Sequence, residues 1–257
     1  MNKINVLFTI SYKGTNYSGW QVQPKKQTIQ GEIESALERL FNEKVEVVGS
    51  GRTDAGVHAL GAKANALLNA DFLSKHFSKN GKLDFIKFRD AINQLLPENI
   101  QILSIKRVPI TFNARFLAKK KTYEYKLQNG GILSPFDSET TVLVRQKLDI
   151  DAMIAASKYL IGEHDFTSFC SAQTQTNDHI RTIYDIKITK KSNKILIDIT
   201  GNGFLYNMVR IIVGTLVEIG LKKKNASEMK TILSSKDRSK AGKTYPAHAL
   251  FLKKVVY

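Results

Sequence analysis

The chain has 257 residues, of which 42% are apolar, and a mean hydropathy of −0.22. These values predict a globular protein with a sizeable core, built as one large domain or two modest ones, and they exclude a disordered chain. The 39 lysines and arginines outweigh the 23 carboxylates and give a net charge of +16. Such a balance favours a polyanionic partner, of which nucleic acid is the most obvious, over an ordinary lysine-rich surface.

Several protein classes are excluded or disfavoured at the same level. No apolar run reaches membrane-spanning length, and the N-terminus enters a strand-like pattern without a signal-peptide layout, so we expect a cytoplasmic protein. The single cysteine, Cys170, excludes an internal disulfide framework and is expected to pack in or near the core. The five histidines are scattered without zinc spacing, and no phosphate-loop or dinucleotide motif is present. We therefore expect neither a metal nor a cofactor.

The first half of the chain, residues 1–108, is predicted to form an α+β unit of the pattern β-α-β-β-α-β. Thr28 is a plausible N-cap for a helix whose apolar residues share one face from Ile29 to Phe41. A polar loop or linker is expected over residues 74–84. The other predicted elements are strands at 4–10, 44–49, 61–69 and 100–108 and a helix at 85–96 that stops at Pro97. The strand at 61–69 is expected to pair antiparallel with the one at 44–49.

The second half, residues 109–257, repeats this mixture of strands and helices after a boundary at Pro109. We expect an irregular polar segment over 163–182 and a long buried helix from Phe204 to Ile219. The remaining predictions are strands at 119–127, 183–189, 195–200 and 249–256 and helices at 149–160 and from Asn225 or Ser227 to Leu233. The predicted fold is thus α+β, with a mixed, mainly antiparallel sheet, flanking helices and two similar halves.

The stretch Gly49-Ser50-Gly51-Arg52-Thr53-Asp54-Ala55-Gly56-Val57-His58-Ala59 stands out for chemistry. Its three glycines suit a bent backbone and close approach to a partner, and they frame one arginine and one carboxylate. A β-branched run precedes it, which is typical of a strand ending in a loop that holds catalytic groups. The alternative is a surface turn with solvated charges.

Arg210 is a second candidate, because it lies in an otherwise apolar helical stretch. A buried arginine needs an acidic partner or an anionic ligand, whereas a long side chain can also carry its charge out to solvent. If Arg210 pairs with Asp54, it would hold that carboxylate ionised and oriented.

Motifs along nearly the whole chain resemble, in the right order, those of the TruA family of tRNA pseudouridine synthases. The stretch from Gly51 to Ala59 is similar to the family's catalytic loop. The other matching segments are Tyr12–Thr15, Gly19–Pro24, Thr28–Glu32, Phe112–Phe116 with Thr122–Tyr125, Gly162–Phe169 and Gly203–Gly214. One departure is Ala249, which stands where the family usually has glycine and adds a methyl group beside the expected base pocket.

The resemblance implies a pseudouridine synthase fold and the isomerisation of uridine to pseudouridine in tRNA, at positions 38 to 40 of the anticodon stem-loop. It makes Asp54 the catalytic carboxylate, supported by Arg210. It makes Tyr123 the stacking partner of the target uracil and Arg52 the side chain that fills the gap left by the flipped base. It further implies a homodimer that needs no cofactor and no metal, while His58, His164 and Asp165 are expected to be structural.

Three other functions fit the same residues. A non-catalytic RNA-binding protein would share the basic surface, although it gains nothing from Asp54 facing RNA phosphates. A hydrolase could use Asp54 to cleave an N-glycosidic bond and release free uracil. The same isomerisation could also act on another RNA site, to which Ala249 gives some weight.

Overall fold

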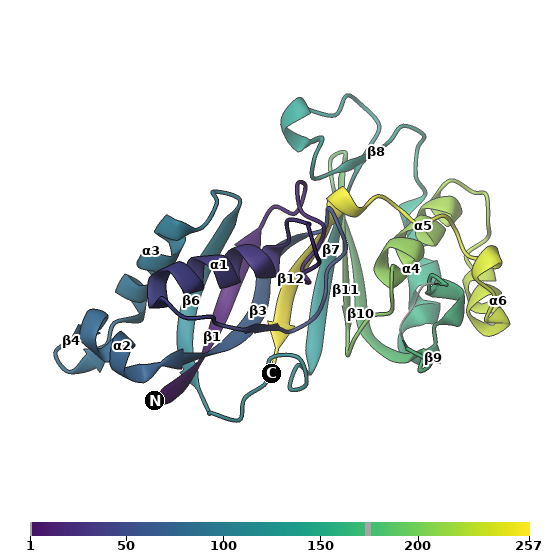
Figure 1. The fold of residues 1–257 in the computed structure, drawn as a ribbon. Helices are drawn as coiled ribbons and strands as arrows, with labels where there is room; N and C mark the ends of the chain where they lie inside the picture. The colour runs from purple at the N-terminus through teal and green to yellow at the C-terminus, as the bar shows by residue number, and fades with distance from the viewer. Residues whose placement is uncertain (1, 173–175) are drawn as a thin grey trace. The chain divides into compact units, whose positions relative to one another are not determined.

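The computed structural model describes residues 2–172 and 176–257, and the chain divides into two compact units (Figure 1). The first unit comprises Met1–Lys119 together with Leu252–Tyr257, and the second comprises Lys120–Phe251. The end of the chain therefore returns to the unit in which the chain begins, whereas the predicted halves follow each other along the sequence.

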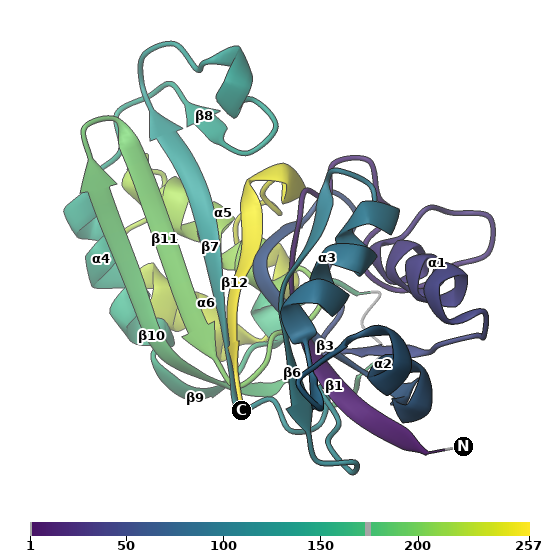
Figure 2. The same cartoon turned by 90° about the vertical axis from the view of Figure 1, so that its left-hand side faces the viewer.

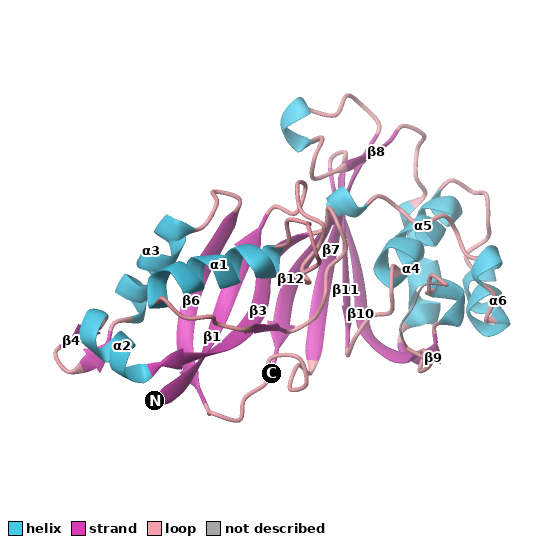
Figure 3. Cartoon of the chain, in the orientation of Figure 1, coloured by secondary structure: helices cyan, strands magenta, loops and turns pink. Residues whose placement is uncertain are grey.

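The first unit contains strands in the order β6-β1-β3-β12, in which β1 is antiparallel to β6 and to β3 and the short strand β2 is antiparallel to β3. Helices α1 and α3 cover one face of this sheet (Figure 3). The elements of this unit are β1 (Lys3–Tyr12), α1 (Ile29–Phe41), β2 (Val47–Gly49), β3 (His58–Asn69), α2 (Ala70–His76), β4 (Ser78–Lys79), β5 (Lys82–Leu83), α3 (Phe85–Leu95), β6 (Ile100–Val108) and β12 (Leu250–Val256).

The core of the first unit follows from the side-chain periods of its elements. Helix α1 starts at the predicted cap, since the Thr28 hydroxyl accepts a hydrogen bond from the Gly31 N–H. Alternate residues of β1 turn toward the helices, as the period of two requires, and they are buried from Ile4 to Tyr12. Beyond them the rings of Phe41, Phe72, Phe77 and Phe88 meet in an aromatic cluster between the helices.

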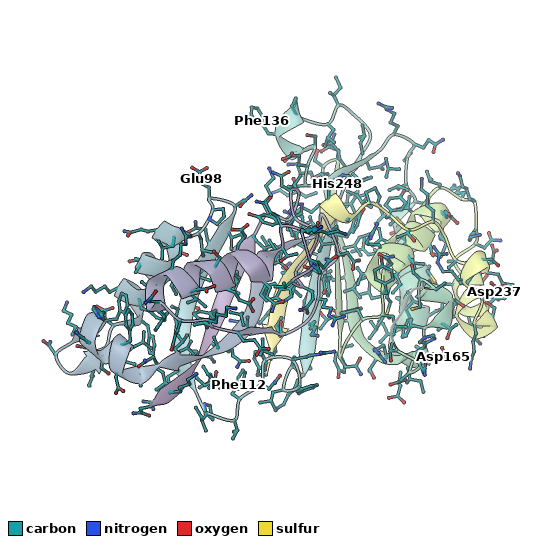
Figure 4. The ribbon with its side chains drawn as sticks, in the orientation of Figure 1. Glu98, Phe112, Phe136, Asp165, Asp237 and His248 are labelled. Carbon is teal, nitrogen blue, oxygen red and sulfur yellow. The ribbon has the colours of Figure 1, made fainter. Side chains whose placement is uncertain are left out.

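The end of the chain is fixed to the first unit by several contacts. The Lys119 N–H donates to the Val256 carbonyl, and the Tyr257 hydroxyl donates to the Ala114 carbonyl at 3.1 Å. The ring of Phe112, labelled in Figure 4, packs edge-on against the ring of Tyr257. Strand β12 is thereby held beside β3.

The second unit contains strands in the order β7-β11-β10-β9, all antiparallel, with β8 parallel to β7. Helices α4, α5 and α6 pack together behind these strands (Figure 2). The elements are β7 (Lys120–Asn129), β8 (Val142–Val144), α4 (Ile150–Ser157), β9 (Gly162–Asp165), β10 (Ile180–Lys191), β11 (Lys194–Gly201), α5 (Met208–Gly220) and α6 (Glu228–Ser235), joined in part by short 3₁₀ turns.

Helix α5 is the centre of the second unit's core. Every residue of α5 is buried except Arg210 and Glu218. The backbone of the segment after α6 crosses the helix so closely that a Cβ on Gly214 would lie 1.9 Å from the Lys243 carbonyl oxygen. A side chain at position 214 would therefore push the two segments apart.

The structure confirms the predicted α+β class and most predicted elements, and it corrects three of them. The predicted loop at 74–84 holds the end of α2 and the small β4–β5 hairpin. The predicted irregular segment at 163–182 includes most of β9 and the start of β10. The predicted helix at 204–219 begins only at Met208, because Asn207 has a left-handed backbone (φ 61°) that interrupts the helical path. Within residues 2–172 and 176–257, none of the helices combines the length and the apolar character that crossing a bilayer requires.

Candidate active site

The loop that carries Arg52 and Asp54 connects β2 to β3 in the first unit. Its central residue, Thr53, is buried, whereas Asp54 is half-buried and Arg52 is exposed. The buried threonine thus separates two charged side chains that differ in their access to solvent. This arrangement is that of a loop fixed at its middle with functional groups on both sides of the fixed point.

Two hydrogen bonds anchor Thr53. The Tyr12 and Thr53 hydroxyl groups lie 2.8 Å apart, and the Trp20 N–H donates to the Thr53 carbonyl at 3.0 Å. Burial raises the pKa of Tyr12 above its ordinary value, so the phenol stays protonated. Tyr12 and Trp20 are both buried, with ring centroids 6.2 Å apart, so these two aromatics pack in the core.

A second loop, residues 13–20, packs against the Asp54 loop through glycines. Gly19 has φ +93°, and a Cβ at this position would lie 2.5 Å from the Thr53 carbonyl oxygen. A Cβ on Gly14 would lie 2.0 Å from the Val57 carbonyl oxygen. The Gly14 N–H donates to Nδ1 of buried His58 at 2.9 Å, which confirms the structural role expected for this histidine. Glycine is required here because two main chains touch directly.

Tyr123 lies on β7 in the second unit, where its cross-strand partner is Ile199. Only 9% of Tyr123 is exposed, and its ring meets Phe204 edge-on with centroids 5.2 Å apart and an interplanar angle of 87°. Phe204 belongs to the turn that precedes α5. The strand and the turn together fix the plane of the Tyr123 ring.

Arg210 is the third residue of α5 and is half-buried. Its Nε donates to the Tyr245 carbonyl at 2.6 Å, and its Nη1 donates to the Asn207 Oδ1 at 2.5 Å. The Tyr125 hydroxyl donates to the next carbonyl in that segment, that of Pro246. Burial raises the pKa of Tyr125, and the positive charge of Arg210 opposes this rise. The guanidinium is therefore held in a polar setting next to a protonated phenol.

The segment after Pro246 accommodates the alanine that departs from the expected motif. Ala249 is fully buried and ends a 3₁₀ turn, Ala247–Ala249, whose middle residue His248 is labelled in Figure 4. Its φ is not in the left-handed region, so no glycine is needed for the backbone. The local chain path thus accepts this methyl group without strain.

Of the four candidate residues, Arg52 and Asp54 share one loop of the first unit, whereas Tyr123 and Arg210 belong to β7 and α5 of the second. The pairing of Arg210 with Asp54 stays a prediction. The sequence does not predict the supporting contacts of Tyr12, Thr53 and Asn207. Each of these contacts joins a motif residue to a partner that the motif does not specify. Among the described residues, no group of three or more His, Cys, Asp or Glu side chains could hold a metal ion.

Comparison with known proteins decides the family. The family model "tRNA pseudouridine synthase" matches residues 9–116 and 156–257. The chain belongs to this family. Proteins named tRNA pseudouridine synthase A are 46% identical in Brevibacillus brevis over 248 residues (96% of this chain, 97% of the relative) and 44% identical in Caldicellulosiruptor saccharolyticus over 253 residues (98% and 99%). In Clostridium tetani, tRNA pseudouridine synthase A 2 is 45% identical over 255 residues, which is 98% of both chains.

Members of the tRNA pseudouridine synthase family isomerise uridine to pseudouridine in tRNA. The matched ranges contain Arg52, Asp54 and Arg210, while Tyr123 lies in the stretch between them. For a tRNA pseudouridine synthase, a half-buried carboxylate on a fixed loop is a chemically reasonable centre, because it can meet a nucleotide without first being ordered.

Proposed function

We propose that this tRNA pseudouridine synthase acts on uridines 38 to 40 of the anticodon stem-loop. The N1–C1′ glycosidic bond breaks, the uracil turns, and C5 bonds to C1′, while C5 loses a proton and N1 gains one. Atoms and electrons balance within the nucleotide, so the reaction requires no redox partner and no transferred group. We accordingly propose a cofactor-free enzyme.

Asp54 is the proposed catalytic carboxylate. The observation that carries this assignment is the fixed loop, in which buried Thr53 is anchored by Tyr12 and Trp20 while Asp54 stays half-buried next to it. Such a carboxylate can serve as a nucleophile at C1′, add to the base, or remove a proton at C2′, provided that it is ionised. Arg210 is proposed to favour the ionised form.

The target uridine is proposed to leave the base stack before it reacts. Flipping costs a few kcal/mol, and exposed Arg52 is long enough and polar enough to occupy the vacated space. The Tyr123 ring, fixed by Phe204, would stack on the uracil. Both roles rest on the family resemblance and on these placements within each unit.

The net charge of +16 supports tRNA as the partner, because folded RNA is recognised mainly through its phosphates and shape. We propose that the enzyme works as a homodimer in the cytoplasm, where it meets its substrate. A dimer would offer a basic surface larger than one chain provides.

The decisive variants are Asp54→Asn and Asp54→Ala. Both are expected to abolish pseudouridine formation in a single-turnover assay with tRNA, while tRNA affinity stays within a few-fold, because a neutral residue removes the chemistry and leaves the phosphate contacts. Asp151→Asn, on the exposed first turn of α4, is the matched control and should retain full activity. Turnover that persists in both Asp54 variants would end the assignment.

The same assay separates the alternatives. With tRNA labelled in the uracil ring, the isomerase keeps all label in the RNA, a glycosidic hydrolase releases free uracil, and a pure RNA-binding protein changes nothing. Mapping pseudouridines in tRNA from cells with and without the protein tests the position. Loss at a site other than 38 to 40 would keep the chemistry and correct the target.

A further inference from the structure

We propose that Asn207 is a positioning residue that orients the Arg210 guanidinium for the reaction. The proposal rests on the proposed function in so far as it assigns Arg210 a role in catalysis. Asn207 occupies the N-cap position of α5, with φ 61° and ψ 4°. Asparagine at a helix N-cap ordinarily accepts a hydrogen bond from a backbone N–H of the first turn, yet the Asn207 side chain makes no such bond.

The amide of Asn207 instead forms hydrogen bonds with two other side chains. Its Oδ1 accepts from Nη1 of Arg210 at 2.5 Å, and its Nδ2 donates to the Ser171 hydroxyl at 3.0 Å. Arginine can only donate, so the oxygen of the amide must face Arg210 and the nitrogen must face Ser171. The serine therefore fixes which way the amide points, and the amide fixes Nη1.

Two attachment points determine the orientation of a planar guanidinium. Nε is held by the Tyr245 carbonyl, which belongs to the main chain, and the Tyr245 N–H donates back to the Arg210 carbonyl at 3.2 Å. Nη1 is held by a side chain, that of Asn207. With Nη1 released, the guanidinium loses the side-chain contact that, together with the contact at Nε, fixes the orientation of its plane. Asn207 is thus the contact of this pair that a substitution can remove without disturbing the main chain.

The chemistry of the Asn207 amide suits the task of orienting the Arg210 guanidinium. A neutral amide accepts a hydrogen bond without neutralising the guanidinium, whereas a carboxylate would pair with it and weaken its effect on a nearby anion. Asn207 also holds a left-handed backbone conformation, which is unfavourable for most residues other than glycine and less so for asparagine. Glycine would suit that backbone at least as well, so the side chain is what asparagine contributes.

The test is Asn207→Gly, since glycine keeps the left-handed backbone and removes only the amide. We expect the melting temperature and tRNA affinity to stay near wild type, while the single-turnover rate constant falls about 10- to 100-fold, as misplacing a catalytic group by roughly 1 Å does. The acid limb of the pH–rate profile should move to higher pH, because the catalytic carboxylate loses a well-placed cation. Ser171→Ala should shift both quantities in the same direction by less.

Asn42→Gly is the matched control, because Asn42 is likewise left-handed (φ 53°) at the end of α1 and should leave rate and pH profile unchanged. The proposal would be overturned if Asn207→Gly kept the wild-type single-turnover rate constant and acid limb. It would equally be overturned if the rate constant fell while the acid limb of the pH–rate profile stayed in place.

The ¹⁵Nε–¹Hε resonance of Arg210 separates the positioning of Arg210 by Asn207 from the catalytic role of Arg210. If this resonance broadens in Asn207→Gly while Arg210→Ala retains full activity, Asn207 positions Arg210 but Arg210 has no catalytic role. An unchanged resonance in Asn207→Gly refutes the positioning itself.

Discussion

At the scale of single residues, the Asp54 loop depends on anchors that do not titrate near neutral pH. Thr53 is held by a phenol that stays protonated and by a backbone N–H, so its geometry is independent of pH over the physiological range. Any pH dependence of activity should then come from the reacting groups rather than from loosening of the loop. Titrating contributions to stability lie elsewhere, and Asp165 is the clearest of them.

Asp165, labelled in Figure 4, accepts a 2.6 Å hydrogen bond from the Thr167 hydroxyl and lies 2.9 Å from Nζ of Lys236. The Thr167 bond first, and Lys236 after it, lower the pKa of Asp165 to about 2 in the folded protein. The unfolded carboxyl titrates at about 3.9. The stabilisation is therefore present above that value and is lost as the pH falls toward about 2.

We therefore expect Asp165→Asn to lower the melting temperature at pH 7 and to differ progressively less from wild type between pH 4 and pH 2. Thermal melts across this range provide the measurement. Lys236→Gln removes one of the two causes and should give a smaller difference with the same pH trend. A difference between wild type and Asp165→Asn that stays constant down to pH 2 would contradict the assignment.

At the scale of elements, the site of the first unit is built where two loops touch through glycines. The 13–20 loop closes on the Asp54 loop at a distance that only a missing Cβ allows. The strands that carry the two loops, β1 and β3, are neighbours in the sheet, so the loops emerge beside each other. The Asp54 loop is thus held in place by a pair of elements rather than by its own residues alone.

Gly19→Ala should destabilise the protein by about 2 to 5 kcal/mol. Alanine would be placed in a left-handed conformation, and its Cβ would clash with the main chain of Thr53, which would have to move. Gly81 offers a matched control, with φ +74° but no atom within 4 Å of the added Cβ. Gly81→Ala should cost only about 1 to 2 kcal/mol. Denaturant titration measures both, and equal losses would show that the loop contact contributes nothing.

The sequence predicts those elements whose side-chain period is long and clean. Helix α1 has 13 residues with one apolar face and a threonine cap, and its bounds match the prediction. Helix α2 has only seven residues with two buried positions, Ala70 and Leu73, which is too short for a period to show. Strand β9 (Gly-Glu-His-Asp) lacks β-branched residues and pairs only because β10 lies next to it.

At the site, the sequence supplies the motif residues but not their supports. No local sequence pattern predicts the hydrogen bond between the Tyr12 and Thr53 hydroxyl groups, because the two residues are 41 positions apart. The sequence pattern predicts that Asn207 is part of a helix, whereas in the structure it has a left-handed backbone and its side chain accepts a hydrogen bond from Arg210. Contacts of this kind depend on tertiary packing, which no short pattern encodes.

At the scale of the whole molecule, charge is the dominant property. Exposed lysines at 25–26 in the first unit and at 190–191 in the second are two of the clusters that contribute to the net +16. A polyanion that binds such a surface releases counterions, so affinity depends on salt. The electrostatic contribution to binding should therefore be large and independent of the chemistry at Asp54.

Binding of tRNA should weaken steeply with salt, by about 10³-fold or more between 50 and 200 mM if roughly six or more phosphates are contacted. Filter binding or fluorescence anisotropy at several salt concentrations gives the slope. Asp54→Asn should show the same slope as wild type, since it changes no phosphate contact. A nearly flat dependence would contradict recognition through the phosphate backbone.

The return of the chain's end to the first unit has a consequence for biosynthesis. Residues Leu252–Tyr257 are synthesised after the second unit, yet they belong to the unit that contains β1. During synthesis, β3 can therefore pair with β1 and β2 before β12 exists, and β12 joins the first unit only after the second unit has been made. A chain truncated after Phe251 would therefore contain the whole second unit and an incomplete first unit.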